Sequence, residues 1–368
     1  MDLEGAFQVA VDWDGSRVRS TQVHSTRSDF AQTLLAGRRA HDARAVLPRV
    51  FSVCAWAQAT AIAAALDAAR GIEEHDARQR EVAVRAEAAL EYLWRLQIDL
   101  PALLGLPQPP HALAQLRSDL GRAGGAASNW PSFIGALRTA LEGEGLGPGG
   151  GFEPTDPAGF DNWATRSQAR AARLLRAVRA APLRPGRTAL LAGTTTALLR
   201  KIGAALASGP GFSRRPEYDG APAECGARAR LDQHALLDAV GAGTSRAYQR
   251  VLARAIELQE TPERLMRLLD GEATQPWIRS VALAPGHGIA GVETARGLLV
   301  HEVTLAGDRI ASYRLVAPTE WNFHPDGALA ADLDGVPAHT AREVRRLASL
   351  AIQSLDPCVR FDVRVAHA

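Results

Sequence analysis

The period of the hydrophobic pattern changes twice along this chain of 368 residues. Near the N-terminus, two short alternating segments (7–11 and 17–21) flank an Asp-Gly turn, which predicts a β-hairpin. From 28 to 269 the apolar residues recur mostly at helical spacing. Alternation returns from 277 to 316, where 306–308 join two strand-like segments as a hairpin. The pattern predicts an α+β fold that is mainly helical, with small antiparallel β elements near the N-terminus and at about 277–316.

Start and stop signals divide the helical part into separate helices. The expected helices are 28–37, 54–70, 73–100 (stopped by Pro101), 112–120, 132–141, 164–179, 188–208, 231–269 and 341–355. The expected strands in the second alternating part are 278–283, 297–305 and 309–315. We expect a single domain over 1–368. It comprises a β-hairpin region (1–26), a helical body (27–270) with loops at 143–157 and 210–226, a β region (277–316), and a C-terminal helix with a cysteine motif (341–368).

Composition excludes several classes of partner and location. The 42 basic and 40 acidic residues leave a net charge of +2, which gives no support for binding nucleic acid or a membrane surface. The N-terminus is acidic where a signal peptide is basic, and the most apolar stretch, 55–69, is short for a membrane span. Three cysteines, an odd number, argue against a disulfide-stapled secreted protein. We expect a cytoplasmic protein.

Two of the cysteines have the positions of potential metal ligands. Cys54 opens a predicted helix, where exposed N–H groups favour a thiolate, and Gln58 lies one turn further on the same face. Cys358 follows a helix C-terminus, where the dipole disfavours negative charge, so its thiolate would need a nearby cation or metal. The alternative is that each is a small apolar residue, as most free cysteines are.

Five segments resemble motifs of the large subunit of nickel–iron hydrogenases, in the same order along the chain. They read LAGRRAHDA (35–43), RVFSVCAWAQATA (49–61), GVETARGLLVH (291–301), VAPTEWN (316–322) and DPCVRFDVR (356–364). The second and last segments resemble R-x-C-G-x-C-x-x-x-H-x-x-A and D-P-C-x-x-C-x-x-H. The resemblance implies the α+β fold of that large subunit.

The chain departs from those motifs at the metal ligands. Phe51 and Phe361 stand where the family has cysteines, and Gln58 and Arg364 stand where it has histidines. A nickel–iron cluster needs four thiolates, and only Cys54 and Cys358 remain at the motif positions. We therefore expect no nickel.

The resemblance also implies a pocket for iron. The family arginine that matches Arg296 points over the iron and its cyanide ligands, and Asp356 matches an aspartate beside the same pocket. The segment 318–322, which includes Pro318 and Thr319, matches a wall of this pocket. Gln58 is also expected to line the pocket. Two alternatives stay open: Arg296 could pair with Glu293, and Trp321 could be a core aromatic.

The chain also resembles proteins of the HupK/HoxV type, which are relatives of the large subunit with a degenerate metal site. That resemblance implies a non-catalytic scaffold or chaperone in assembly of the nickel–iron site. Its expected cargo is iron carrying two cyanides and a carbon monoxide, Fe(CN)2(CO), held transiently by Cys54 and Cys358. The expected partners are the hydrogenase large-subunit precursor and small iron-carrying maturation chaperones.

Two other functions remain possible readings of the same residues. One is a metal-free structural relative that acts as a protein-binding surface, like relatives in respiratory complex I. The other is a divergent hydrogenase subunit. Cys225 matches no motif and is expected to be structural or incidental.

Overall fold

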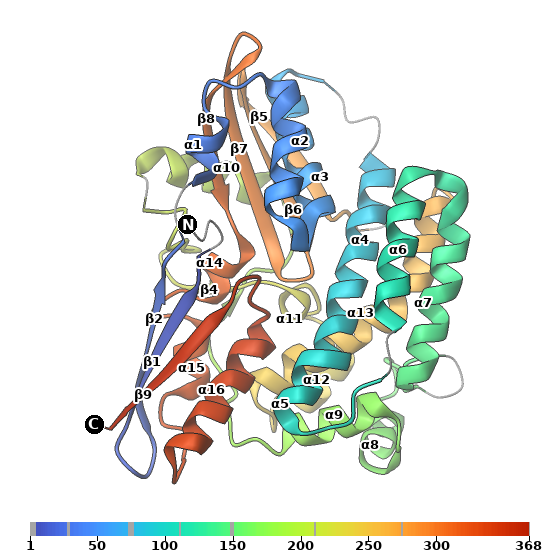
Figure 1. The fold of residues 1–368 in the computed structure, drawn as a ribbon, viewed down its shortest axis with the longest axis vertical. Coiled ribbons are helices and arrows are strands. Elements are labelled where there is room, and N and C mark those ends of the chain that lie inside the picture. The colour runs from blue at the N-terminus through green and yellow to red at the C-terminus, as the bar shows by residue number, and fades with distance from the viewer. Residues whose placement is uncertain are drawn as a thin grey trace.

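The computed structural model describes residues 5–27, 30–72, 77–109, 112–147, 151–209, 211–273 and 275–367. Figure 1 shows a four-stranded sheet with helices beside it, a group of long helices, and a smaller sheet that contains segments from both ends of the chain. The strands are β1 (Phe7–Trp13), β2 (Val18–Ser25), β3 (Ala189–Leu190), β4 (Ala223–Glu224), β5 (Ile278–Ala284), β6 (His287–Thr294), β7 (Gly297–Ala306), β8 (Arg309–Val316) and β9 (Phe361–His367).

The helices account for most of the remaining described chain. They are α1 (Phe30–Leu35), α2 (Ala40–Val50), α3 (Ala55–Ala69), α4 (Ala77–Trp94), α5 (Leu100–Leu104), α6 (Ala112–Gly125), α7 (Trp130–Glu144), α8 (Pro157–Arg166), α9 (Arg170–Arg179), α10 (Thr196–Ser208), α11 (Ala227–Arg230), α12 (Ala235–Gly241), α13 (Arg246–Leu269), α14 (Pro318–Asn322), α15 (Ala328–Leu333) and α16 (Ala341–Leu355). The predicted α+β class, mainly helical, is confirmed.

The four-stranded antiparallel sheet, in the order β5-β6-β7-β8, is covered on both faces. Ala290 and Leu299 belong to the same buried cluster as helix α3. Ile289 and Leu298 belong to a second cluster with α10 on the opposite face. The sequence pattern predicted β5, β7 and β8 and missed β6. Because β6 is buried on both faces, its residues show no alternation of apolar and polar side chains.

The smaller sheet joins the two ends of the chain, in the order β2-β1-β9. The predicted hairpin is confirmed, with β1 and β2 each longer than expected. Strand β9, which the sequence pattern did not predict, pairs in parallel with β1, so that Phe7 lies opposite Phe361 and Val9 opposite Val363. This pairing anchors the segment that follows Cys358.

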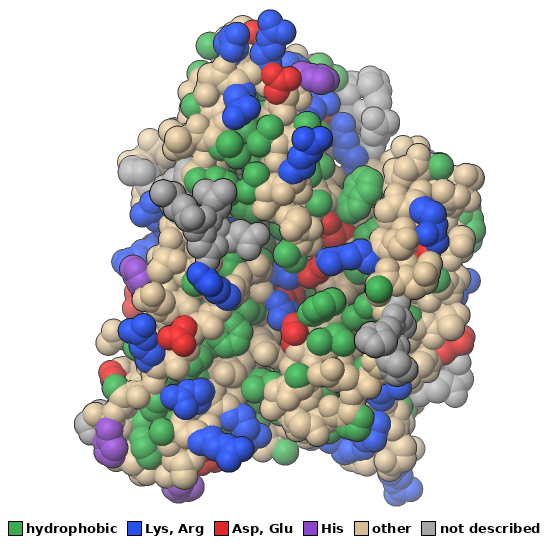
Figure 2. Space-filling model, in the orientation of Figure 1, with side chains coloured by type: hydrophobic (Ala, Val, Ile, Leu, Met, Phe, Trp, Pro, Cys, Tyr) green, Lys and Arg blue, Asp and Glu red, His purple; other side chains and the backbone are tan. Residues whose placement is uncertain are grey.

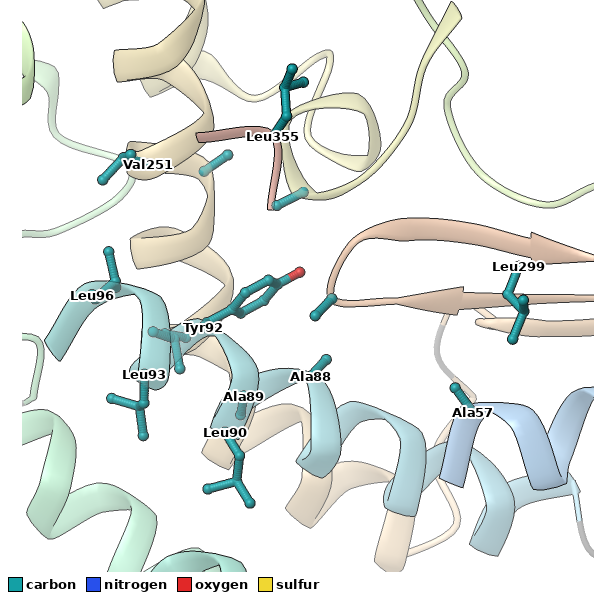
Figure 3. Close-up of a cluster of buried hydrophobic side chains, with 14 of the residues drawn as sticks. Ala57, Ala88, Ala89, Leu90, Tyr92, Leu93, Leu96, Val251, Leu299 and Leu355 are labelled. Carbon is teal, nitrogen blue, oxygen red and sulfur yellow. The ribbon is translucent and has the colours of Figure 1, made fainter. Parts of the chain in front are cut away.

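The long helices α4 and α13 pack together beside α6 and α7 (Figure 1). Figure 3 shows Leu90 and Leu93 near the end of α4 and Leu96 in the turn Arg95–Asp99 that follows it, with Val251 of α13 nearby. The same view shows Ala57 of α3 beneath Leu299 of β7. By length and composition alone, Ser52–Ala69 could cross a membrane, but 61% of it is buried inside the fold, as in a core helix.

Several predicted helix bounds were wrong. Pro101 does not stop the helix before it, because α4 passes through a π-helical turn at Arg95–Asp99 into α5. Proline lacks an N–H and its ring clashes with the carbonyl four residues earlier, so the ladder shifts and the Leu100 N–H donates to the Arg95 carbonyl.

Other bounds differ more simply. Helix α2 was not predicted, 164–179 forms the two helices α8 and α9, and 188–208 contains β3 as well as α10. The expected helix start at 28–29 and the residues 73–76 lie outside the described residues. The last helix, Ala341–Leu355, has the predicted bounds.

Candidate metal-binding site

A small cavity of about 30 Å³ brings segments from both ends of the chain together. Five of the predicted site residues line it: Cys54, Gln58, Arg296, Pro318 and Cys358. They come from the start of α3, the β6–β7 turn, the start of α14 and the segment after α16. The two cysteines, distant in sequence, therefore face the same cavity.

Cys54 is the residue before α3 and the last residue of a 3₁₀ turn, Ser52–Cys54. The Gln58 amide, one helical turn on, lies 3.8 Å from its sulfur. The first N–H groups of the helix, on Trp56 and Ala57, donate to the two oxygens of Glu87, each at 2.9 Å. Burial, reinforced by the Glu87 charge, raises the pKa of Cys54 to about 12. The expectation that the helix start favours a thiolate is wrong for the metal-free protein, because Glu87 already occupies those donors.

Cys358 has the nearby cation that its position requires. Arg27 Nη1 lies 3.4 Å from the Cys358 sulfur and donates to Thr319 Oγ1 at 2.7 Å. Thr319 Oγ1 is itself 3.6 Å from that sulfur, and Glu320 pairs with Arg27 at 3.7 Å. Thr319, predicted to line the pocket, is thus a neighbour of Cys358 but does not itself line the cavity. Arg27 was not predicted, because it belongs to none of the motifs.

Arg296 stands at the tip of a tight hairpin. Thr294 pairs with Gly297, which leaves Ala295 and Arg296 as the two turn residues between β6 and β7. Gly297 has φ +117°, and a Cβ there would lie 2.4 Å from the Cys225 sulfur. Only glycine fits such a close approach with this backbone conformation. The turn thereby fixes the backbone position from which the Arg296 side chain extends.

The Arg296 guanidinium is buried between two carboxylates. Its Nη2 donates to Glu91 at 2.9 Å, and its Nε lies 3.5 Å from Asp356. Burial alone would lower the pKa of Arg296, but these two carboxylates outweigh it and raise the pKa above the ordinary value. The alternative pairing with Glu293 is wrong, since Glu293 pairs with Arg230 at 2.7 Å.

Asp356 is fully buried and adopts a left-handed backbone conformation, with φ 59°, at the end of α16. Arg95 Nε donates to it at 2.5 Å. Burial opposes ionisation, but Arg296 and Arg95 together lower the pKa of Asp356 to about 2. Asp356 is therefore an ionised partner of Arg296 rather than a lining residue.

Cys225 and Trp321 lie behind the cavity. The backbone N–H of Cys225 donates to Asn322 Oδ1 at 2.9 Å, and its sulfur is 3.7 Å from the Arg296 carbonyl and 3.6 Å from the Pro318 carbonyl. Burial raises the pKa of the Cys225 thiol. The structural interpretation of Cys225 is supported by these contacts, and Trp321 packs in the core against Phe212.

Three residues, Phe51, Phe361 and Arg364, stand where the resembled motifs have a cysteine or a histidine, and they lie in different parts of the structure. Phe51 lines the cavity and packs against Phe30, with ring centroids 5.4 Å apart. Phe361 and Arg364 lie on β9 and do not line the cavity. Phe361 borders a neighbouring cleft, and Arg364 is exposed beside Asp362.

That neighbouring cleft has a volume of about 480 Å³ and reaches Cys358 and Arg296 from the outside. Its other lining side chains include Glu91, Trp94 and Arg95. Figure 2 shows acidic and basic side chains gathered in a hollow near the centre of this face, between the C-terminal segment and the helices beside it. Cys358 thus borders both the enclosed cavity and an open cleft.

Comparison with known proteins identifies the family of the chain. A family model for nickel-dependent hydrogenases matches residues 216–363. The hydrogenase expression/formation protein HoxV of Cupriavidus necator is 33% identical, over 93% of this chain and 92% of HoxV. HupK of Azotobacter vinelandii, also a hydrogenase expression/formation protein, is 32% identical over 91% of each chain. The chain belongs to the HoxV/HupK family of hydrogenase expression/formation proteins.

Solved structures show the same fold for this HoxV/HupK-family protein. The Ni-Fe-Se hydrogenase of D. vulgaris Hildenborough superposes with a TM-score of 0.57 over 94% of both chains, at 18% identity. That of Desulfomicrobium baculatum gives a TM-score of 0.59 over 95% of both chains, at 17% identity. The predicted family and the large-subunit-like fold are confirmed, and the names of the relatives indicate a role in maturation of a hydrogenase.

The donor set of the HoxV/HupK-family protein suits a metal that brings ligands of its own. Among the residues that the structure describes, no three His, Cys, Asp or Glu side chains are grouped so that they could hold a bare metal ion. Two thiols and two guanidiniums, those of Arg27 and Arg296, instead line the cavity. Such a set fits an iron that already carries anionic ligands, because the thiols bind the metal and the guanidiniums donate to the anions.

Proposed function

We propose that this HoxV/HupK-family protein is a non-catalytic scaffold that holds an iron carrying two cyanides and one carbon monoxide. It then passes this cargo to the hydrogenase large-subunit precursor. The observation that carries the proposal is that Cys54 and Cys358 line one enclosed cavity with Arg296.

Arg296 supports the proposal through an unused donor. Its Nε is buried and lies 3.5 Å from Asp356, an ion pair, but makes no hydrogen bond within the part of the chain that the structure describes. A buried donor without an acceptor costs free energy, about 1–3 kcal/mol. A cyanide nitrogen next to Arg296 would supply the acceptor.

The thiols are suited to reversible binding. Metal binding requires each thiol to lose its proton, so protons compete with the metal. Because the pKa of Cys54 is about 12, this competition is strong at neutral pH and weakens the hold on the cargo. Two thiol ligands, one of which has a raised pKa, allow the metal to be released, whereas four thiolates would retain it.

The residues around the thiols argue against turnover of hydrogen. Phe51 occupies the cavity wall at a position where the related enzymes carry a thiolate, and a phenyl ring does not bind nickel. Gln58, with 3% of its surface exposed, faces the same cavity and does not titrate as a histidine does. We propose a cytoplasmic protein without nickel, whose partners are the large-subunit precursor and small iron-carrying maturation chaperones.

Infrared spectroscopy tests this function directly. Protein purified without oxygen from a host that makes the iron–cyanide–carbonyl group should show cyanide and carbonyl stretching bands and contain iron. Cys54→Ala and Cys358→Ala should each lose the bands, because each removes one of two metal ligands. Cys225→Ala is the matched control, since its thiol faces backbone carbonyls behind the cavity; it should keep them.

Each other outcome identifies a different function. Bands that persist in both Cys54→Ala and Cys358→Ala would refute the proposed ligands. Absence of bands and iron in the unaltered protein would favour a metal-free protein-binding surface. Hydrogen uptake by the purified protein would favour a divergent hydrogenase subunit.

A further inference from the structure

One guanidinium ties the helical body to the segment that carries Cys358. Arg95 begins the π-helical turn Arg95–Asp99, at the end of α4. π-Helical turns redirect side chains and occur often at functional sites. This turn exists because Pro101 interrupts the regular ladder. Pro101, in α5, therefore influences where Arg95 points.

Arg95 makes three hydrogen bonds, two of them to the residues just before Cys358. Its Nε donates to Asp356 at 2.5 Å, and its Nη2 donates to the Pro357 carbonyl at 2.6 Å. Its Nη1 donates to Asp99 at 2.5 Å, which fixes the guanidinium to its own helix turn. The side chain of Arg95 is 13% exposed, so these bonds are largely shielded from water.

The segment that Arg95 holds, Asp356 and Pro357, is a short link between α16 and β9, and the β1–β9 pairing fixes the chain that follows Cys358. Asp356 has a positive φ, a conformation that costs a non-glycine residue free energy and persists only where surrounding contacts impose it. Arg95 and Arg296 are the two ion-pair partners that supply such contacts within the described residues. Asp356 therefore links the two arginines, and Cys358 follows it by two residues.

The same segment separates two spaces. Cys358 borders the enclosed cavity with Cys54, and it also borders the open cleft that Arg95 lines. A small displacement of the segment would move its sulfur between these spaces. Arg95 fixes Asp356 and Pro357, and Arg27 and Thr319 contact the sulfur itself, so Arg95 contributes to which space the thiol faces.

We propose that Arg95 is a positioning residue for Cys358. It holds the thiol toward the enclosed cavity, and loosening of its bonds to Asp356 and Pro357 turns the thiol toward the open cleft, where a partner can take up the cargo. This inference rests on the proposed function for its purpose and identifies the face through which cargo is exchanged.

The test measures the reactivity of each thiol in the metal-free protein. Iodoacetamide labelling followed by mass spectrometry gives separate rates for Cys358 and Cys54. In Arg95→Gln the Cys358 rate should rise roughly tenfold, as expected for the loss of charged hydrogen bonds, while the Cys54 rate stays unchanged. Arg95→Lys, which keeps the charge but not the forked geometry, should give an intermediate Cys358 rate.

Arg117→Gln is the matched control. Arg117 lines the same cleft and contacts Glu91 at 3.4 Å, but its side chain is 62% exposed and it makes no bond to the C-terminal segment within the described residues. Its removal should leave the Cys358 rate unchanged. The melting temperature of every variant is measured alongside.

An unchanged Cys358 rate in Arg95→Gln would overturn the inference. So would an equal rise in the Cys54 and Cys358 rates, which indicates general loosening of the fold. If Arg95→Gln does not fold, the rate in Arg95→Lys decides. Because no iron is present, failure here leaves the proposed iron-holding function untouched, and absence of infrared bands leaves the positioning role untouched.

Discussion

At the scale of single residues, the state of Cys54 depends on Glu87. The Glu87 carboxylate occupies the N–H groups that would otherwise favour a thiolate at the start of α3. Burial, with a smaller contribution from Glu91, raises the pKa of Glu87 itself to about 7. Near neutral pH, Glu87 therefore exchanges a proton while it accepts hydrogen bonds from the start of α3. Glu87 lies one helical turn from Glu91, which pairs with Arg296.

This raised pKa predicts how stability depends on pH. A carboxyl whose pKa is higher in the folded state binds more protons when folded, so stability falls as pH rises from the unfolded pKa, near 4.5, to about 7. Glu87→Gln removes this proton, so we expect it to reduce the loss of unfolding free energy between pH 5 and pH 8 by up to about 3 kcal/mol. Denaturant titrations at the two pH values measure this.

The control for this measurement is Glu263→Gln. Glu263 lies on α13 with 67% of its side chain exposed, so its removal should leave the pH dependence unchanged. Asp356 does not interfere, because its lowered pKa contributes stability that is lost only as pH falls toward 2. If Glu87→Gln and the unaltered protein lose stability equally, the proposed titration of Glu87 is wrong.

The sequence predicted some site residues and not others, for a physical reason. Cys54, Arg296 and Cys358 lie in linear motifs, so their meeting could be predicted from resemblance. Arg27 and Arg95 lie in no motif, and they reach Cys358 and its neighbours only through tertiary packing. Contacts of this kind leave no signal in local spacing, and the protonated state of Cys54 likewise depends on a residue of another helix.

At the scale of elements, the position of Cys54, just before α3, depends on the packing of α3 against the four-stranded sheet. Helix α3 is rich in alanine and lies against β6. A Cβ on Gly288 of β6 would lie 2.3 Å from the Ala65 carbonyl oxygen and 2.4 Å from the Ala69 nitrogen. Since these are backbone atoms of a helix, they cannot move aside cheaply.

Gly288→Ala is therefore expected to destabilise the fold by about 1–3 kcal/mol, the usual cost of overpacking. Gly135→Ala is the matched control, because Gly135 lies inside α7 with no atom within 4 Å of an added Cβ. That change should be neutral or stabilise by about 0.5–1 kcal/mol. Unfolding free energies from denaturant titration compare the two. A smaller loss for Gly288→Ala than for Gly135→Ala would contradict the close packing of α3.

Strands β6 and β9 were missed for different reasons. Strand β6 lies between α3 and α10, so burial on both faces hides the alternation by which strands are recognised. Strand β9 alternates apolar and polar residues from Phe361 to Val365, but it pairs with β1 across nearly the whole length of the chain. A parallel pairing with so distant a partner has no local sequence signal.

At the scale of the whole molecule, the site exists because the two ends of the chain meet. The parallel pairing of β1 with β9 fixes the chain after Cys358, and α16 with Asp356 fixes it before. The helix α3 brings Cys54 from the N-terminal part to the same cavity. The large-subunit-like fold thus brings Cys54 and Cys358 to one cavity, while several positions that match ligand positions of the resembled motifs carry phenylalanine, glutamine or arginine.

The most direct measurement of this account is X-ray absorption at the iron edge of the iron-loaded protein, which counts the sulfur atoms bound to the metal. We predict two sulfur neighbours in the unaltered protein and a single sulfur on any iron that remains in Cys54→Ala or Cys358→Ala. An iron bound without sulfur, or one that keeps both sulfurs in either variant, would contradict it.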